Sequence, residues 1–230
     1  MARRPLSPFT ILWARHVVNY SEIFSGALQE LSESATLSGD EDAISEKLCP
    51  FLSKACFNFR KTKNLELQTP YWESPIQPVN QEELKGGKKR RRPDFTCRLI
   101  NKWANSYEES EISLHIECKL LGNPTSATWI LNENYVKNGI KRFDSETHEY
   151  GKRANSGIMI GYIISMTPEQ IENEVNFYQK THIPENSKIK FSFDTKPLFK
   201  SNQNIKRKNV IPTPFELIHL WIDLREKYKN

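Results

Sequence analysis

The stretch Ile112-Ser-Leu-His-Ile-Glu-Cys-Lys-Leu120 alternates apolar and polar side chains along its whole length. Its apolar positions are Ile112, Leu114, Ile116, Cys118 and Leu120. Successive side chains of a strand point to opposite faces of a sheet, so this period of two predicts a half-buried β-strand. The intervening polar residues then share the other face, and they are Ser113, His115, Glu117 and Lys119.

A second alternating segment precedes this one. Phe95, Cys97 and Leu99 alternate with polar residues that begin at Asp94. The polar connection over 101–111 is short enough for an antiparallel pair, although it is not a tight hairpin. Asp94 therefore starts a strand beside the one that carries Glu117.

The remaining segments predict helices around a sheet. Apolar periodicity predicts helices over 9–34, from about 41 to 55, and over 128–143, with Pro50 expected to kink or divide the second. Further strands are predicted over 157–164 and 188–194, and helix-capping signatures at 167–170 and 213–216 predict helices after 167 and over 215–228. We expect a mixed α/β or α+β fold with a central mixed sheet of about four to five strands flanked by helices.

Length and composition indicate one globular unit. The chain has 230 residues, of which 37% are hydrophobic and 27% charged, so collagen-like and wholly disordered chains are excluded. We expect 1–36 to be a helical segment packed on the core of a domain over 37–230. No apolar run approaches the roughly 20 residues that span a bilayer, and the opening MARRPLSPFT lacks a signal-peptide pattern, so a cytoplasmic protein without membrane contact is expected. The four cysteines form no CxxC pair and are expected to be free buried thiols.

The excess positive charge is local. The run Lys85-Gly-Gly-Lys-Lys-Arg-Arg-Arg92 carries six positive charges, and removing them from the net +5 leaves −1 for the rest of the chain. Such a run is either a solvated loop or a contact for a polyanion such as nucleic acid. Because it leads directly into Pro93 and Asp94, we favour nucleic-acid contact.

Asp94, Glu117 and Lys119 form the combination with the clearest chemistry. Glu117 and Lys119 are two positions apart on one strand face, and Asp94 is on a neighbouring strand. Two carboxylates suit Mg²⁺, which also keeps waters and substrate phosphates as ligands. An adjacent ammonium offsets charge that grows on a phosphate. Together these groups predict hydrolysis of a phosphodiester.

The half-motifs Arg92-Pro93-Asp94-Phe95 and His115-Ile116-Glu117-Cys118-Lys119 resemble the PD-(D/E)XK, or restriction-endonuclease-like, nuclease superfamily. The resemblance spans roughly residues 40–165. It implies that Asp94, Glu117 and the backbone carbonyl of Cys118 bind Mg²⁺, for which Mn²⁺ can substitute. It further implies that Lys119 is either the base that positions the attacking water or a charge stabiliser, and that the enzyme cuts DNA to leave 5′-phosphates. Bacterial restriction and anti-phage systems commonly use such nucleases.

Other residues are candidates for an additional metal ligand or for nucleic-acid contacts because of their position. Many members of this superfamily add an acidic ligand from the helix before the sheet, and Glu41 lies on the inward stripe of that helix, although Ser38 to Glu41 also fits a helix-capping box. The nucleic-acid contacts expected are Lys88, Lys89, Arg90, Arg91, Arg92, Tyr135 and Arg142.

Several alternatives remain open at this stage. Glu117 and Lys119 would be an ordinary surface ion pair if Asp94 only capped a turn. A non-catalytic nucleic-acid-binding subunit would keep the fold without the reaction, and a nuclease on RNA or branched DNA would use the same residues. The sequence carries no symmetry information, so a homodimer and a partner subunit of a defence complex are equally compatible with it.

Overall fold

The computed structural model describes residues 7–33, 36–85 and 92–229. The helices are α1 (Pro8–Glu33), α2 (Glu41–Lys63), α3 (Gln81–Lys85), α4 (Leu131–Lys137) and α5 (Pro168–His182). The strands are β1 (Tyr71–Trp72), β2 (Phe95–Ile100), β3 (Glu111–Leu121), β4 (Ser156–Ile163), β5 (Leu198–Ile205) and β6 (Phe215–Asp223). Two short 3₁₀ helices are η1 (Tyr107–Glu109) and η2 (Ile140–Asp144).

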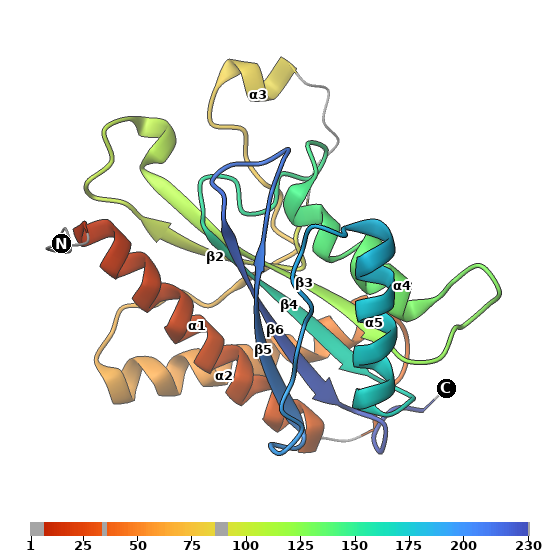
Figure 1. The fold of residues 1–230 in the computed structure, drawn as a ribbon. Coiled ribbons are helices and arrows are strands. Elements are labelled where there is room, and N and C mark those ends of the chain that lie inside the picture. The colour runs from red at the N-terminus through yellow and green to blue at the C-terminus, as the bar shows by residue number, and fades with distance from the viewer. Residues whose placement is uncertain (1–6, 34–35, 86–91, 230) are drawn as a thin grey trace, which may run out of the picture.

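The strands form one mixed sheet in the order β1-β2-β3-β4-β6-β5 (Figure 1). The pairs β2–β3 and β5–β6 are antiparallel, whereas β3–β4 and β4–β6 are parallel. The α/β class and the antiparallel β2–β3 pair confirm the expectations from the sequence. The sheet has six strands, so the expected four to five was too low.

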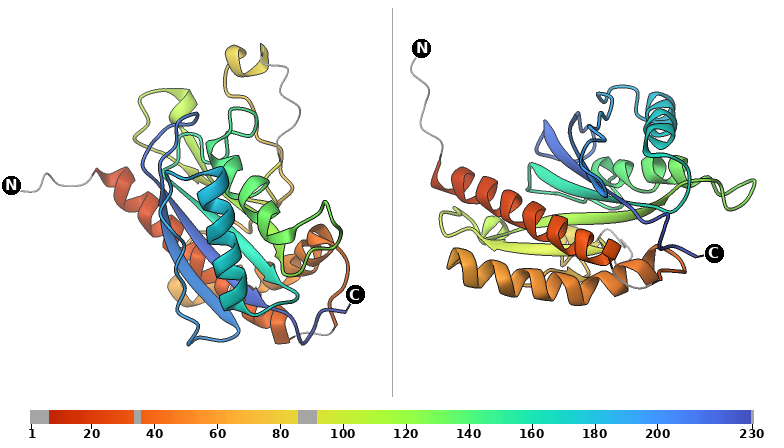
Figure 2. Two further views of the ribbon diagram at one scale, coloured as in Figure 1. Left: turned by 45° about the vertical axis from the view of Figure 1, so that its right-hand side comes forward. Right: turned by 90° about the horizontal axis from the view of Figure 1, so that it is seen from below.

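Helices cover both faces of the sheet and create two apolar cores. In Figure 2, α1 and α2 lie side by side on one face, and α4 and α5 lie on the other. On the α1–α2 side, Leu114, Ile116 and Cys118 of β3 are completely buried, which is the apolar row that the alternation predicts. The side chains of Glu117 and Lys119 consequently leave β3 on the opposite face, where Glu117 contacts Arg142 of η2, while the amine of Lys119 reaches Glu41 at the start of α2.

The N-terminal helix belongs to the same core as the sheet. Its long apolar stripe includes Tyr20 and Phe24, both fully buried, and the Phe24 ring meets Phe95 of β2 edge to face at 5.5 Å between centroids. A helix with one apolar stripe buries that stripe against a sheet, which explains its place. Across the described ranges, every helix is too short or too polar to cross a bilayer.

The last predicted helix, over 215–228, is wrong, because the chain forms β6 there. Both faces of β6 are covered, so Leu217, Leu220 and Trp221 are all fully buried although they point to different sides. A strand covered on both faces reads as a continuous apolar run rather than as an alternation. That run also fits the spacing of apolar residues in a helix, and Thr213-Pro214 resembles a helix start, so both features favoured a helix where the chain forms a strand.

Two further predictions need correction. Residues 188–194 pair with no strand, because they cross over β6, where the Phe191 ring lies 4.1 Å from that of Trp221. The helix predicted over 128–143 is instead α4 followed by η2. The break falls at Gly139, where a Cβ would lie 2.4 Å from the Tyr135 carbonyl oxygen.

The remaining helix predictions can be compared directly with the structure. Thr167 and Gln170 form the predicted capping box at the start of α5. Pro50 lies inside α2 and does not divide it. Glu46, whose carbonyl would otherwise accept from residue 50, is exposed like Pro50 itself, so water can satisfy that carbonyl.

Candidate active site

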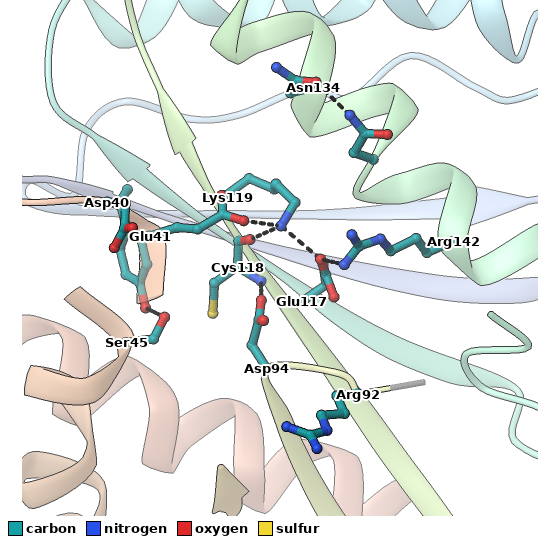
Figure 3. A network of polar contacts seen from close by, with 12 residues as sticks. Asp40, Glu41, Ser45, Arg92, Asp94, Glu117, Cys118, Lys119, Asn134 and Arg142 are labelled. Atoms are coloured by element: carbon teal, nitrogen blue, oxygen red, sulfur yellow. Dashed lines mark hydrogen bonds and ion pairs between the residues drawn. The ribbon is translucent and has the colours of Figure 1, made fainter. Parts of the chain in front are cut away.

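The candidate site lies where β2 separates from β3. Phe95 pairs with Ile116, and beyond that point β3 continues to Leu121, where β4 is its one sheet neighbour among the described residues. The backbone N–H of Cys118 therefore has no partner strand on the β2 side. Asp94, the residue immediately before β2, accepts a hydrogen bond from it through Oδ2 at 2.5 Å (Figure 3).

Lys119 occupies the centre of the site. Its Nζ lies 2.7 Å from Oε1 of Glu117 and 2.6 Å from Oε1 of Glu41, and it donates to the carbonyl oxygen of Cys118 at 2.7 Å. Its side chain is only 6% exposed. Burial alone would lower the pKa of this amine, but the charges of Glu117, Glu41 and Asp94 raise it above its usual value. Lys119 is thus a buried ammonium that bridges carboxylates from β3 and α2.

Glu117 is completely buried. Its Oε1 accepts from Lys119 and from Nη1 of Arg142, whereas its Oε2 has no hydrogen-bond partner among the described residues. Burial and the nearby charge of Asp94 raise the pKa of Glu117 to about 8, although Lys119 and Arg142 oppose that shift. Buried polar atoms are normally paired, so the free oxygen marks a position suited to another group.

The pKa of the Asp94 carboxyl is raised, like that of Glu117. Burial raises its pKa to about 6, and the charge of Glu41 adds to that effect, while Lys119 and the N–H of Cys118 oppose it. Burial is thus the main reason that the carboxyl groups of Asp94 and Glu117 hold their protons more tightly than exposed ones. Since Glu117 and Lys119 are both buried, the alternative of a surface ion pair is wrong.

Glu41 enters the site from the first turn of α2. The cap of this helix is Asp40, whose side chain accepts from the backbone N–H of Ala43 at 3.0 Å, so the alternative in which Glu41 closes a capping box is wrong. One turn later, Ser45 lies 3.1 Å from the hydroxyl of Tyr162 on β4 and fixes this end of α2 beside the sheet. Nothing in the sequence marks Ser45 or Tyr162 as part of the site.

The predicted nucleic-acid contacts fall in different places. Arg142, on η2, is part of the site through its contact with Glu117. Arg92 is exposed, and its carbonyl oxygen accepts from the hydroxyl of Tyr150 at 2.7 Å. Lys88, Lys89, Arg90 and Arg91 lie outside the described residues. Tyr150, which thus fixes the entry to β2, could not be recognised from the sequence.

Tyr135 does not face the site, which corrects the expectation of a nucleic-acid contact. It is fully buried in the core under α4, where its hydroxyl lies 2.7 Å from Nδ1 of His219 and accepts from Nε1 of Trp221 at 2.9 Å. The helix predicted over 128–143 carried both Tyr135 and Arg142. In the structure α4 ends at Lys137 and Arg142 lies on η2, so the two side chains do not share one helix face.

Replacing Tyr135 by Phe should therefore change stability and leave any catalysis intact. The substitution leaves two buried ring nitrogens, of His219 and Trp221, without a partner, and each such loss costs about 1–3 kcal/mol. We expect urea unfolding to show a loss of about 2–6 kcal/mol for the two groups together, with any activity of the site at 25 °C unchanged. A weaker activity at unaltered stability would contradict the placement of Tyr135 in the core.

The donor set suits a hard divalent cation. Asp94 and Glu117 supply carboxylate oxygens, and the backbone carbonyl of Cys118, the residue after Glu117, adds a third oxygen. With all groups ionised, three carboxylates (Glu41, Asp94, Glu117) and two cations (Lys119, Arg142) leave a net charge of −1. Oxygen ligands in this number fit Mg²⁺, which completes its shell with water. The described ranges contain no group of three or more His, Cys, Asp and Glu already arranged to hold a metal ion. The Cys118 carbonyl, which would be one of the ligands, accepts a hydrogen bond from Lys119.

No family model matches the chain, and neither does any curated protein or solved structure.

Proposed function

We propose that this protein is a Mg²⁺-dependent endonuclease of the PD-(D/E)XK type that hydrolyses phosphodiester bonds of DNA. The observation that supports it most is the convergence of three side chains. Asp94 contacts the backbone of Cys118, and Lys119 contacts Glu117, so residues separated by 22 intervening positions meet at one strand edge. A structural ion pair needs neither the second carboxylate, from the half-buried Asp94, nor the unpaired oxygen of Glu117.

Asp94, Glu117 and the carbonyl of Cys118 are the groups that would hold the ion. When bound, Mg²⁺ lowers the pKa of water and neutralises charge on the phosphate. Arg142 holds the Glu117 carboxylate in place through Oε1, and Asp94 is oriented by the N–H of Cys118. These contacts position both carboxylates before substrate arrives, as electrostatic catalysis requires.

The role of Lys119 follows from its charge state. The surrounding carboxylates keep it an ammonium, so it has protons to donate and no lone pair with which to accept one. We therefore assign it to charge stabilisation and to orienting the attacking water, rather than to abstracting a proton. This choice narrows the two roles that the family resemblance allows.

Cleavage of plasmid DNA tests the proposal. The wild-type protein should convert supercoiled plasmid to nicked or linear forms with Mg²⁺ or Mn²⁺ and not with EDTA. The Asp94→Asn variant, which keeps an acceptor for the N–H of Cys118, should be inactive, whereas Asp194→Asn on the surface should cut normally. Equal cutting by all three would remove Asp94 from the mechanism, and preferential cutting of RNA or branched DNA would redefine the substrate.

Ion binding can be measured without catalysis. Ca²⁺ should raise the melting temperature of the wild-type protein, because a ligand present at 100 times its Kd adds about 2.7 kcal/mol to the free energy of unfolding. Asp94→Asn should abolish that increase, and Asp194→Asn should retain it. Identical responses of all three proteins to Ca²⁺ in thermal unfolding would place the ion elsewhere.

A further inference from the structure

A cavity of about 290 Å³ lies beside the candidate active site, on the same polar face of β2 and β3. Its floor comprises Thr96, Arg98, Ser113 and His115. Thr96 pairs directly with His115, and each is two positions along its strand from Asp94 or Glu117. Two strand residues rise about 6.6–6.8 Å, so the floor of the cavity is roughly one nucleotide step from the carboxylates.

The walls of this cavity are fixed by ion pairs. The segments 75–84 and 149–153 meet over the sheet, where Glu83 contacts Nζ of Lys152 at 2.7 Å and also Nη2 of Arg153. The other carboxylate oxygen of Glu83 accepts from the backbone N–H of Val79 at 2.9 Å. The first segment is thereby held to the second, and the cavity exists without any ligand.

The floor includes one buried hydroxyl that the described part of the protein leaves without a hydrogen-bond partner. Thr96 is only 5% exposed, and its Oγ1 has no hydrogen-bond partner in the described part of the chain. Nδ1 of His115 accepts from the backbone N–H of Gly151 at 2.9 Å, so a neutral ring carries its proton on Nε2. A buried hydroxyl without a partner is costly, and a ligand group that hydrogen-bonds to it would recover that cost.

The charges and size of the cavity argue against an anion. Its lining holds three cations (Arg98, Lys152, Arg153) and three carboxylates (Glu83, Glu111, Glu149), so it attracts neither sign. Ile76 and Val79 supply apolar wall surface above the polar floor. The volume lies close to the lower limit of the roughly 300–1,000 Å³ of small-molecule sites, so the cavity has room for one small ring system. The balanced charges, apolar walls and polar floor suit a neutral group with polar edges.

We propose that this cavity receives an unpaired nucleobase next to the phosphate that is cut. The location of that phosphate rests on the proposed function, whereas the cavity and its free hydroxyl do not. A base inside a duplex cannot reach a closed pocket unless it leaves the stack, and a base that is already unpaired does so at lower cost. The preferred substrate is accordingly DNA with an unpaired nucleotide at this position.

Three DNA duplexes of otherwise equal sequence separate the outcomes. One carries a single bulged nucleotide, one an abasic bulge, and one is fully paired. With Ca²⁺ in place of Mg²⁺ and salt held constant, we expect the bulged duplex to bind about tenfold tighter than the other two, corresponding to about 1.4 kcal/mol. A 2-aminopurine placed in the bulge should change its fluorescence on binding.

Thr96→Val tests the pocket specifically, because it keeps the side-chain shape and replaces the hydroxyl by a methyl group. It should bring binding of the three duplexes to within about threefold, while Thr62→Val, an exposed position at the far end of α2, should keep the wild-type preference. Equal binding of the bulged and abasic duplexes by the wild-type protein would overturn the proposal even if plasmid is cut. Base-dependent binding that Thr96→Val abolishes would support the pocket even if no cleavage is found.

Discussion

Replacing Lys119 by Met should lower the rate of DNA cleavage about 10³-fold, measured at saturating Mg²⁺. The substitution keeps most of the apolar stem and removes the ammonium that contacts Glu117, Glu41 and the Cys118 carbonyl. Because the two carboxylates remain, the ion should still bind, and the loss should fall on kcat more than on the Mg²⁺ requirement. A fall in kcat with little change in the Mg²⁺ requirement would distinguish Lys119 from a metal ligand.

The same variant should also respond differently to metal in stability measurements. Breaking a buried ion pair by removing one partner costs about 3–5 kcal/mol, and this applies above about pH 8, where Glu117 is ionised and its carboxylate is left close to that of Glu41. A divalent cation should recover part of that loss, so Ca²⁺ should stabilise Lys119→Met more than it stabilises the wild-type protein. Lys137→Met, which removes an exposed lysine on α4, is the matched control and should change neither quantity. A Lys119→Met protein that cuts at the wild-type rate would exclude a catalytic role for the amine.

The sequence was informative where one local pattern determines one structural feature. The alternation from Ile112 to Leu120 placed Glu117 and Lys119 on one face of β3, and the short connection to β2 brought Asp94 alongside. A sheet propagates these local patterns over long distances, because strand register fixes which residues are opposite each other. The meeting of Asp94 with the Cys118 backbone could thus be predicted in outline from two short segments.

The sequence failed where burial, rather than periodicity, determines the structure. β6 is apolar on both faces, so its pattern did not separate strand from helix, and Tyr135 was assigned to the wrong side of a helix that breaks at Gly139. The contact between Arg142 and Glu117 depends on how η2 follows α4, which no local pattern encodes. Likewise, the free hydroxyl of Thr96 becomes meaningful only once residues 75–84 are seen to close a cavity above it.

Replacing Glu117 by Gln should lower the rate of DNA cleavage by about 10³-fold or more. It should also change how the free energy of unfolding depends on pH. Gln keeps the size of the side chain but cannot supply a charged ligand to the ion. Arg142 and Lys119 lose their common carboxylate as well, so the orientation of the site is affected together with its charge. Glu216→Gln, on the half-buried start of β6, is a control in which a strand glutamate is neutralised away from the site.

The pH dependence of Glu117 follows from its raised pKa in the metal-free protein. Since the pKa of Glu117 is about 8 in the folded state and near 4.5 as its ordinary value, the folded protein retains a proton that the unfolded chain has released. The stability contributed by that proton is complete below about pH 4.5 and is lost as the pH rises through 8. Relative to Glu117→Gln, the wild-type protein in EDTA should therefore lose free energy of unfolding between pH 5 and 8, by at most about 1.4 kcal/mol per pH unit. Urea unfolding of both proteins across that interval measures the difference, and parallel curves would mean that Glu117 is already ionised in the folded state.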